Sequence, residues 1–472
     1  MIRPISLYVD LDGTLTLTDT LHEQIVGLMR SRPWILLLAP YWLMCGGKAR
    51  LKHEVARRVT LEVQNLPYDR ATLEQIFEYQ AQGRKIVLAT AANTEIAEAV
   101  AAHIGVFDEV ISSTPEVNLS GRSKLNKIRE SDSEFAYIGN GRADIPIWEH
   151  ATEKFIVNGP ATLERRIIAA GGTSLGKRDS ILAGLVKAAR PHQWLKNLLL
   201  FVPLLVAHKI GDPSAISSAG IGFLSFCLCA SGVYVLNDLL DIENDRKHHK
   251  KRFRPFAAGT VPIPYGIAAS LILTLAGIAL AISVNWPFVL VLCGYLLITN
   301  AYSFRLKKVI MLDVVTLAGL YTARVIAGAE AIDVPLSFWL LSFSMFLFLS
   351  LALVKRYCEI AALEDSGVQE AGGRGYSVDD KGIITQLGTA SGIVSVLVMA
   401  LYVNSEAISA LYSEPRFVWI VCPLLLYWIG RIWLLAHRGE VDEDPVVFAA
   451  KDMRTMLVGA LVAVAFILAS TQ

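Results

Sequence analysis

The sequence predicts two domains of different fold class: a soluble α/β domain, followed by an all-α membrane domain with nine transmembrane helices. Three observations lead to this prediction. Of the 472 residues, 53% are apolar and only 18% are charged, whereas soluble domains average about 25% charged residues. The deficit is uneven, because about 24% of residues 1–190 but only about 15% of residues 191–472 are charged. Strand and helix patterns alternate in the first part, and long apolar segments follow one another in the second.

The composition also indicates which partners to expect and where the domains begin and end. A net charge of +1 gives no global attraction to nucleic acid, so we expect no nucleic-acid partner. The six cysteines show no CxxC pair and are interpreted as small apolar side chains in a reducing compartment. We expect a soluble domain over 1–170, a linker and interfacial helix over 171–190, and the membrane domain over 191–472. Glycines at 171, 172 and 176 indicate the flexible linker, and the pattern of 181–189 an amphipathic helix.

Three short apolar segments predict the strands of the first domain. They are Ser6–Asp10, Lys85–Thr90 and Phe135–Ile138. Helical patterns such as Thr94–Ile104 lie between them. Alternating strands and helices form a parallel, doubly wound, Rossmann-like sheet.

Carboxylates follow the first and third of these strands. The first strand runs into Asp10-Leu11-Asp12-Gly13-Thr14-Leu15, and the third leads to Gly139, Asn140 and Asp144. Open α/β sheets bind ligands at the carboxyl ends of their strands. Paired carboxylates there suit a phosphate and Mg²⁺ site.

These motifs resemble the haloacid dehalogenase superfamily of phosphotransferases over roughly residues 5–160. The resemblance implies that Asp10 is the nucleophile that forms an aspartyl-phosphate, and that Asp12 is the general acid and base. It further implies that Thr90 binds phosphoryl oxygens, that Lys124 neutralises developing charge, and that Asp144 is the second acidic position of the last motif. The implied metal ligands for Mg²⁺ are Asp10, Asp12 and Asn140.

One position departs from the family pattern. The last motif of the family usually begins Gly-Asp, but this sequence has Gly139-Asn140. Asn keeps an oxygen ligand and loses a charge, although Mg²⁺ prefers carboxylates. Two hypotheses therefore stand: an active phosphatase, or an inactive domain that serves as a scaffold.

Residues 15–80 lie where this superfamily often places a helical cap. Within them Pro33–Met44 is strongly apolar but too short to span a bilayer. It is either a core helix of the cap or a segment lying on the membrane or on the second domain. Basic residues on both sides favour the membrane interface; they are Arg30, Arg32, Lys48, Arg50 and Lys52.

Nine apolar segments predict the membrane spans. They are about 194–210, 215–238, 263–284, 287–304, 311–330, 336–354, 383–403, 416–436 and 454–470. Basic residues concentrate in every second loop, and the positive-inside rule places those loops in the cytoplasm. We therefore expect a multi-pass protein of the plasma (inner) membrane with a cytoplasmic N-terminal domain.

An acidic motif ends the second predicted span. It reads NDxxDxxxD from Asn237 and contains Asp238, Asp241 and Asp245, whose spacing of three and four puts them on one helix face. Acids at this depth are costly and normally functional, and a divalent metal on a diphosphate would satisfy them. The basic residues that follow either set topology or, as Arg252 and Arg254, clamp phosphate oxygens.

The second part resembles the UbiA-type intramembrane prenyltransferase superfamily over about residues 185–472. Further motifs at 190–197, 254–259, 355–359, 444–445 and 451–452 resemble the branch that contains decaprenyl-phosphate phosphoribosyltransferase. That branch moves phosphoribose from 5-phosphoribosyl 1-diphosphate to a polyprenyl phosphate. The resemblance implies these two substrates, Mg²⁺ and a bilayer as partners. The oligomeric state stays open.

We expect Asp238 and Asp241 to be catalytic and, with Asp245, to bind Mg²⁺. The expected substrate-binding residues of this domain are Lys196, Asn197, Asn237, Arg252, Arg254, Tyr321, Arg324, Lys355 and Arg356. Arg324 binds a substrate phosphate or forms an ion pair with Glu330 or Asp313. The fused domain would then remove the 5-phosphate of the product. Two rival hypotheses are prenyl transfer from a prenyl diphosphate to an aromatic or lipid acceptor, and a transporter or scaffold.

Overall fold

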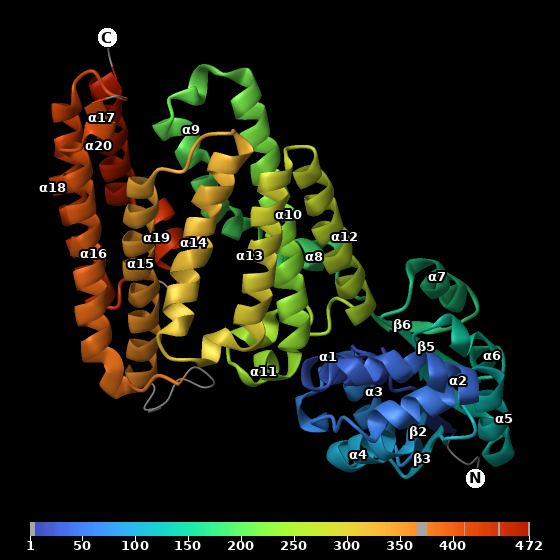
Figure 1. Ribbon diagram of the computed structural model, residues 1–472. Helices are drawn as coiled ribbons and strands as arrows, with labels where there is room; N and C mark the ends of the chain where they lie inside the picture. Colours follow the sequence, from blue (N-terminus) through green and yellow to red (C-terminus); the bar gives the residue numbers. More distant parts are fainter. Residues whose placement is uncertain (1–4, 366–374, 410, 442–443, 471–472) are drawn as a thin grey trace. The chain divides into compact units, whose positions relative to one another are not determined.

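The computed structural model describes residues 5–365, 375–409, 411–441 and 444–470 (Figure 1). The chain forms two compact units. Unit 1 contains Met1–Ala189 and Tyr234–Leu271, and unit 2 contains Arg190–Val233 and Ile272–Gln472. The segment that carries the acidic motif therefore packs with the N-terminal domain, although the sequence pattern joins it to the membrane helices.

Unit 1 is built on a six-stranded parallel sheet in the order β3-β2-β1-β4-β5-β6. The strands are β1 (Ser6–Val9), β2 (Ile86–Asn93), β3 (Glu109–Ser113), β4 (Phe135–Gly139), β5 (Glu153–Val157) and β6 (Thr173–Gly176). The predicted Rossmann-like α/β class is confirmed. The stretch expected to be a flexible linker differs, because Thr173–Gly176 pairs with β5 as the edge strand.

Alternate residues of the central strands enter two cores, as the period of a strand requires. Leu7 and Val9 of β1 face a core shared with α3 (Arg70–Ala81) and α4 (Thr94–Ile104). Tyr8 faces the opposite core. That core is shared with α5 (Arg122–Ser131), α6 (Ile145–Trp148) and α7 (Ala161–Ala169). Helices on both faces bury the sheet, so its strands read as nearly continuous apolar runs.

Helices fill the chain between β1 and β2. They are α1 (Thr20–Ser31), the 3₁₀ segment η1 (Pro33–Leu38), α2 (Ala39–Ala56), η2 (Val63–Asn65) and α3. Asp19 caps α1 by accepting from the backbone N–H of Leu21 and His22. The helix α2 is broken at Gly46 and Gly47, and Gly47 takes a left-handed φ of 63°. A role of these helices as a cap stays a prediction.

Eight helices of the described residues are long and apolar enough to cross a membrane. They are α10 (Pro213–Leu240), α12 (Ile263–Ile282), α13 (Trp286–Phe304), α14 (Leu312–Ala331), α15 (Phe338–Asp365), α16 (Lys381–Val403), α18 (Val421–His437) and α20 (Met453–Ser470). Within unit 2, α13, α14, α15, α16 and α18 run roughly parallel (Figure 1).

The first of the nine predicted spans, 194–210, is not a long α-helix. It forms η4 (Pro191–Phe201), α9 (Val202–Val206) and η5 (Lys209–Gly211). Prolines at 191 and 203 begin these segments, where a missing N–H is tolerated. The count of nine spans stays a prediction.

The acidic motif lies where α10 ends. After Leu240 the chain forms α11 (Ile242–Lys247) and η6 (Lys251–Phe253) before α12 begins. An apolar cluster joins this turn to the N-terminal part of unit 1; its members are Val26, Ala188, Val235, Leu239, Ile242, Phe256, Val261 and Ile263. The predicted helix at 181–189 is confirmed as α8 (Ile181–Ala189), which supplies Ala188.

Candidate functional sites

A buried ion cluster lies at the carboxyl ends of β1 and β4. Asp10 follows β1, and Asp144 ends the short 3₁₀ turn η3 (Arg142–Asp144) after β4. The ammonium group of Lys124, from α5, donates to Asp10 Oδ1 at 2.7 Å and lies 3.7 Å from Asp144 Oδ1. These three residues are no more than 8% exposed. The two carboxylates therefore share one buried cation.

Tyr137 completes this cluster, and the sequence analysis did not identify it. Its hydroxyl accepts from Lys124 Nζ at 3.1 Å and donates to Asp144 Oδ1 at 2.6 Å. The other oxygen of Asp144 accepts from the backbone N–H of Asn140 and Gly141. A tyrosine inside an apolar strand is usually interpreted as a core residue. Its polar contacts become visible only when the fold brings α5 and η3 next to β4.

The remaining predicted residues of this domain surround the same strand ends. Asp12 Oδ1 accepts from the backbone N–H of Thr20, the first residue of α1, at 2.8 Å. The side chain of Asn140 lies against Gly13, where a Cβ atom would come within 2.0 Å of Nδ2. Thr90 is fully buried in β2, and Val9 pairs with Leu88 in the register of the sheet. Thr90 therefore lies inside β2, two residues beyond the position that pairs with the last residue of β1.

Burial sets the electrostatics of the two leading aspartates. It raises the pKa of Asp10 to about 6, although the adjacent Lys124 lowers it. Burial likewise raises the pKa of Asp12 to about 7, with a further contribution from the charge of Asp19. For Lys124, burial lowers the pKa, but the carboxylates of Asp10 and Asp144 outweigh it and raise the value. This arrangement offers an anionic carboxylate near a fixed cation, and a second carboxyl that can exchange a proton near neutral pH.

The donor set at these strand ends fits Mg²⁺. In the parts of the chain that the structure describes, no group of three His, Cys, Asp or Glu side chains is arranged to hold a metal ion. The oxygens of Asp10, Asp12 and Asn140 are nevertheless of the type that Mg²⁺ prefers, and this ion usually keeps several waters. One of these oxygens, Asp10 Oδ1, also contacts the ammonium group of Lys124.

The acidic motif does not form one continuous helix face as predicted. Asp238 belongs to α10, Asp241 is the N-cap residue of α11, and Asp245 lies inside α11. Asp241 has non-helical backbone angles (φ −99°, ψ 9°), so α10 and α11 are separate helices there. Arg254 nevertheless links two of the acids, because its Nη1 lies 3.3 Å from Asp238 Oδ1 and 2.8 Å from Asp245 Oδ2.

Because these carboxylates are buried, they need a nearby cation to offset the cost of burying their charge. Asp238 and Asp245 are each 3% exposed. Burial raises the pKa of Asp245, and the charge of Arg254 acts against this. Arg252 is exposed and lies over the ring of Phe253, and Asn237 is half-buried. Of the two arginines expected to clamp phosphate, Arg254 therefore pairs with carboxylates and Arg252 is exposed.

Unit 2 contains its own buried polar cluster. The guanidinium of Arg324, in α14, donates from Nε to Asn197 Oδ1 at 2.8 Å and from Nη2 to the hydroxyl of Tyr295 at 2.9 Å. Lys196 pairs with Asp444 and lies over the ring of Tyr321. The structure therefore brings four predicted residues together, and adds Tyr295 and Asp444, to which the sequence assigned no role.

Arg356 and Lys355, neighbours on α15, differ in how deeply they are buried. Arg356 is fully buried and pairs with Asp313 and with Glu359. Tyr376 donates to the other oxygen of Asp313 at 2.6 Å. Asp313, considered as a partner of Arg324, is thus paired with Arg356 instead. Lys355 is half-buried.

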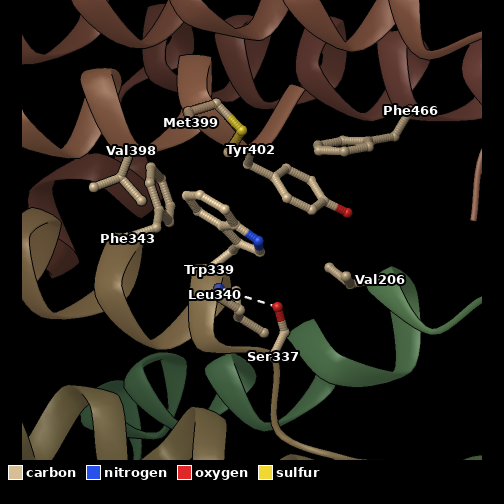
Figure 2. Close-up of a pocket in the computed structure, with 9 residues that line it drawn as sticks. All are labelled: Val206, Ser337, Trp339, Leu340, Phe343, Val398, Met399, Tyr402 and Phe466. Carbon is tan, nitrogen blue, oxygen red and sulfur yellow. Dashed lines mark hydrogen bonds between the residues drawn. The ribbon is translucent and has the colours of Figure 1, made fainter. Parts of the chain in front are cut away.

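A small, partly open apolar pocket lies elsewhere in unit 2 (Figure 2). It is lined by Val206, Ser337, Trp339, Leu340, Phe343, Val398, Met399, Tyr402 and Phe466. The rings of Trp339 and Tyr402 lie with their centroids 6.2 Å apart. Ser337 uses its hydroxyl to accept from the N–H of Leu340 at 3.4 Å. Such a lining suits a hydrocarbon chain.

The fold and these sites define an integral membrane protein that joins a phosphatase-like α/β domain to helices bearing acid-rich and cation-rich polar clusters. Comparison with known families makes this specific. Residues 197–458 match the model described as the UbiA prenyltransferase family, and residues 7–149 match haloacid dehalogenase-like hydrolase. The chain belongs to the UbiA prenyltransferase family and carries a haloacid dehalogenase-like domain in front of the UbiA domain.

Some relatives align with nearly all of this chain, and others with less than half of it. Uncharacterized protein y4nM of Sinorhizobium fredii is 37% identical over 99% of this chain and 91% of its own length. Decaprenyl-phosphate phosphoribosyltransferase of Mycolicibacterium smegmatis is 36% identical over 198 residues, which are 41% of this chain and 62% of that protein. A solved UbiA homolog from Archaeoglobus fulgidus, bound to GPP and Mg²⁺, shares 16% identity with a TM-score of 0.48; the match covers 61% of this chain and 99% of that one.

Proposed function

We propose that the chain transfers 5-phosphoribose from 5-phosphoribosyl 1-diphosphate to a polyprenyl phosphate, and that its N-terminal domain then removes the 5-phosphate. The observation that carries this proposal is the 36% identity with a decaprenyl-phosphate phosphoribosyltransferase. The abundance of buried cations supports it. A donor with three phosphate groups and an acceptor with one need more cations than an aromatic acceptor would.

The acidic motif is proposed to bind the diphosphate of the donor. Asp238 and Asp245 both reach one guanidinium nitrogen, so they already share a cation. With Asp241 they would hold Mg²⁺, which when bound neutralises the charge of a departing pyrophosphate. Arg254, Arg252 and Asn237 would then bind phosphate or ribose oxygens.

The transfer replaces one bond at the anomeric carbon of the ribose. The bond from this carbon to the diphosphate oxygen breaks, and a bond to an oxygen of the polyprenyl phosphate forms. The attacking phosphate is already anionic, so no strong base is needed. We propose that Lys196, Asn197, Tyr321 and Arg324 hold phosphate oxygens, that Lys355 and Arg356 support them, and that the polyprenyl tail enters the apolar pocket of Figure 2.

The haloacid dehalogenase-like domain is proposed to hydrolyse the 5-phosphate in two steps. The carboxylate of Asp10 attacks phosphorus, while Asp12 donates its proton to the departing ribose oxygen. Asp12 then takes a proton from water, which attacks the aspartyl-phosphate and releases phosphate. Thr90 and Lys124 hold the phosphoryl oxygens, and Asp144 fixes Lys124 through the contacts described above. Oxygen ligands from Asp10, Asp12 and Asn140 would hold Mg²⁺, which lowers the repulsion between two anions.

We also propose that the N-terminal domain lies on the cytoplasmic side. Every second loop between the predicted spans is rich in Lys and Arg, which favours the cytoplasmic face. Phosphoribosyl diphosphate is a soluble, highly charged molecule, so a site open to the cytoplasm would give it access.

Turnover of the full chain in nanodiscs tests the proposal. The reaction contains Mg²⁺, radiolabelled 5-phosphoribosyl 1-diphosphate and a polyprenyl phosphate, and lipid products are separated. We expect a phosphoribosyl lipid from the Asp10→Asn variant, a dephosphorylated ribosyl lipid from the unaltered chain, and no ribosylated lipid from Asp241→Ala. Glu243→Gln, in the same turn, should keep full turnover. A chain that makes no ribosylated lipid, but joins a prenyl diphosphate to an aromatic or lipid acceptor, would support the rival reaction.

A further inference from the structure

A group of exposed apolar side chains, close together in the chain, lies outside the core of unit 1. It consists of six side chains of η1 and the first half of α2, namely Trp34, Leu37, Leu38, Tyr41, Leu43 and Met44, which we call the η1–α2 surface. Each is at least 44% exposed, and Met44 reaches 87%. Large contiguous apolar patches on a protein surface mark contacts with another molecule or with a membrane.

The η1–α2 surface is not the core of a cap. None of the six residues of η1 is buried. Trp42 is buried, packs with Leu51 and Val55 and lies under the guanidinium of Arg58, and Ile35 and Ala39 are partly buried against the same cluster. Trp42 therefore anchors the segment to its domain, while the neighbouring apolar side chains stay outside.

Along the chain, the charges beside this surface are of one sign, although in the structure Arg30 also lies 3.5 Å from Glu243. No Asp or Glu occurs between Glu23 and Glu54, whereas this stretch contains Arg30, Arg32, Lys48, Arg50 and Lys52. Arg30, Arg32 and Lys48 are exposed. Lysine and arginine beside an apolar face attract anionic lipid headgroups, each by about 1 kcal/mol near the surface.

We propose that the η1–α2 surface docks on the surface of an anionic lipid bilayer. The segment is too short to cross a membrane, so it would lie in the interface, with Trp34 and Tyr41 at the depth that these residues favour. A second copy of the chain fits less well, because it would bring two basic rims together without acidic partners. A chain with eight candidate membrane spans always has a bilayer within reach. This inference does not depend on the proposed reaction.

Cys45 provides the probe for a test. All six cysteines are free, and Cys45 is exposed next to Met44, whereas the other five are buried or half-buried. The full chain, with Cys293→Ser and Cys358→Ser, is labelled at Cys45 with a fluorophore and placed in nanodiscs that contain brominated anionic lipid. We expect the lipid to quench the label and aqueous iodide to have little effect. The control carries Cys45→Ser and Arg70→Cys, because Arg70 on α3 has a 92% exposed side chain; it should show the reverse.

Two variants decide whether this surface itself makes the contact. Leu37→Ser with Met44→Ser should reduce lipid quenching to the level of the Arg70 control, and because both side chains are exposed, the fold should persist. Phe77→Ser, an exposed apolar position on α3, should leave quenching unchanged. The proposal is overturned if the Cys45 label is open to iodide and unaffected by brominated lipid. Energy transfer between differently labelled copies, without lipid quenching, would show a second copy there instead.

Discussion

At the scale of single residues, the phosphatase-like site depends on one buried lysine. Lys124 lies between Asp10 and Asp144, and the hydroxyl of Tyr137 links it to Asp144. A carboxylate can attack an anionic phosphate only if nearby positive charge offsets the repulsion between them. Asp10, Asp144 and Tyr137 hold Lys124 in place, and in the proposed hydrolysis Lys124 would supply this positive charge.

We expect Lys124→Met to lower phosphatase turnover roughly 10²–10³-fold, because a stabilising charge at the reacting phosphate is lost. Turnover is measured with the ribosyl phosphate lipid or a small phosphomonoester. Lys127→Met is the matched control, since Lys127 lies one turn further on α5 and pairs only with Glu130 at the surface. Unchanged turnover in Lys124→Met would contradict the assigned role.

The hydroxyl of Tyr137 gives a second prediction. Tyr137→Phe removes a donor to a buried carboxylate oxygen of Asp144, which should cost about 1–3 kcal/mol of local stability. Hydrogen exchange of the β4 peptides, measured on the full chain in nanodiscs, reports this loss. Tyr68→Phe is a suitable comparison, because its half-buried hydroxyl donates only to the carbonyl of Val63. Equal protection of β4 in both variants would argue against the contact.

At the scale of elements, α1 and α11 connect the two sites of unit 1. The first N–H of α1 donates to Asp12, and one turn later Glu23 forms two hydrogen bonds with Arg246 of α11. Arg246 directly follows Asp245 of the acidic motif and also donates to the carbonyl of Ala257. The side chains of Arg246 and Glu23 are only 7% and 3% exposed. A buried, doubly bonded pair of this kind fixes the relative position of two helices.

Breaking this pair should therefore loosen both helices. We expect Arg246→Met to lower the opening free energy of α1 and α11 by about 3–5 kcal/mol, because Glu23 is left buried without its partner. Hydrogen exchange of these helices measures the change. Lys247→Met tests the neighbouring exposed pair with Glu62 and should have little effect, since solvent screens such pairs. Charge exchange in Glu23→Arg with Arg246→Glu should restore part of the protection.

At the scale of the whole molecule, the proposed function would put two successive reactions in one chain. A phosphoribosyl lipid formed by the UbiA domain would meet its phosphatase in the same bilayer and at a high effective concentration. The relative from Sinorhizobium fredii aligns with 99% of this chain, so the aligned sequence covers both domains. The order of reactions then follows from the chemistry, because the 5-phosphate enters with the donor.

Separated sites should lose this advantage. An Asp10→Asn chain and an Asp241→Ala chain are placed in different nanodiscs and mixed, so that each supplies one reaction. We expect phosphoribosyl lipid to accumulate and its dephosphorylation to be much slower than with the unaltered chain at equal concentration. Placing both variants in one nanodisc should recover part of the rate. Equal rates in all three arrangements would show that the fusion gives no kinetic coupling.

Local sequence patterns predicted what depends on neighbours in the chain. The strand at Phe135, the helix Thr94–Ile104 and the motif around Asp10 follow from apolar runs, periodicity and residue order. The strand β6 was missed, because Thr173–Gly176 follows two glycines, is mostly half-exposed and becomes a strand only by pairing with β5. The first predicted span, 194–210, is not one long α-helix: a 3₁₀ segment ends at Phe201, and α9, with Pro203 in its first turn, follows it.

The sequence by itself determined the two fold classes, the family and the residue types of both sites, since charge density, hydrophobic period and short motifs are properties of neighbouring residues. Only the tertiary structure decided which charges meet. Arg254 bridges two aspartates across a helix break, Arg356 is buried against Asp313, and Glu23 binds Arg246 more than 200 positions away. These pairings depend on the packing of distant segments, because a buried charge takes whichever partner the fold brings within reach.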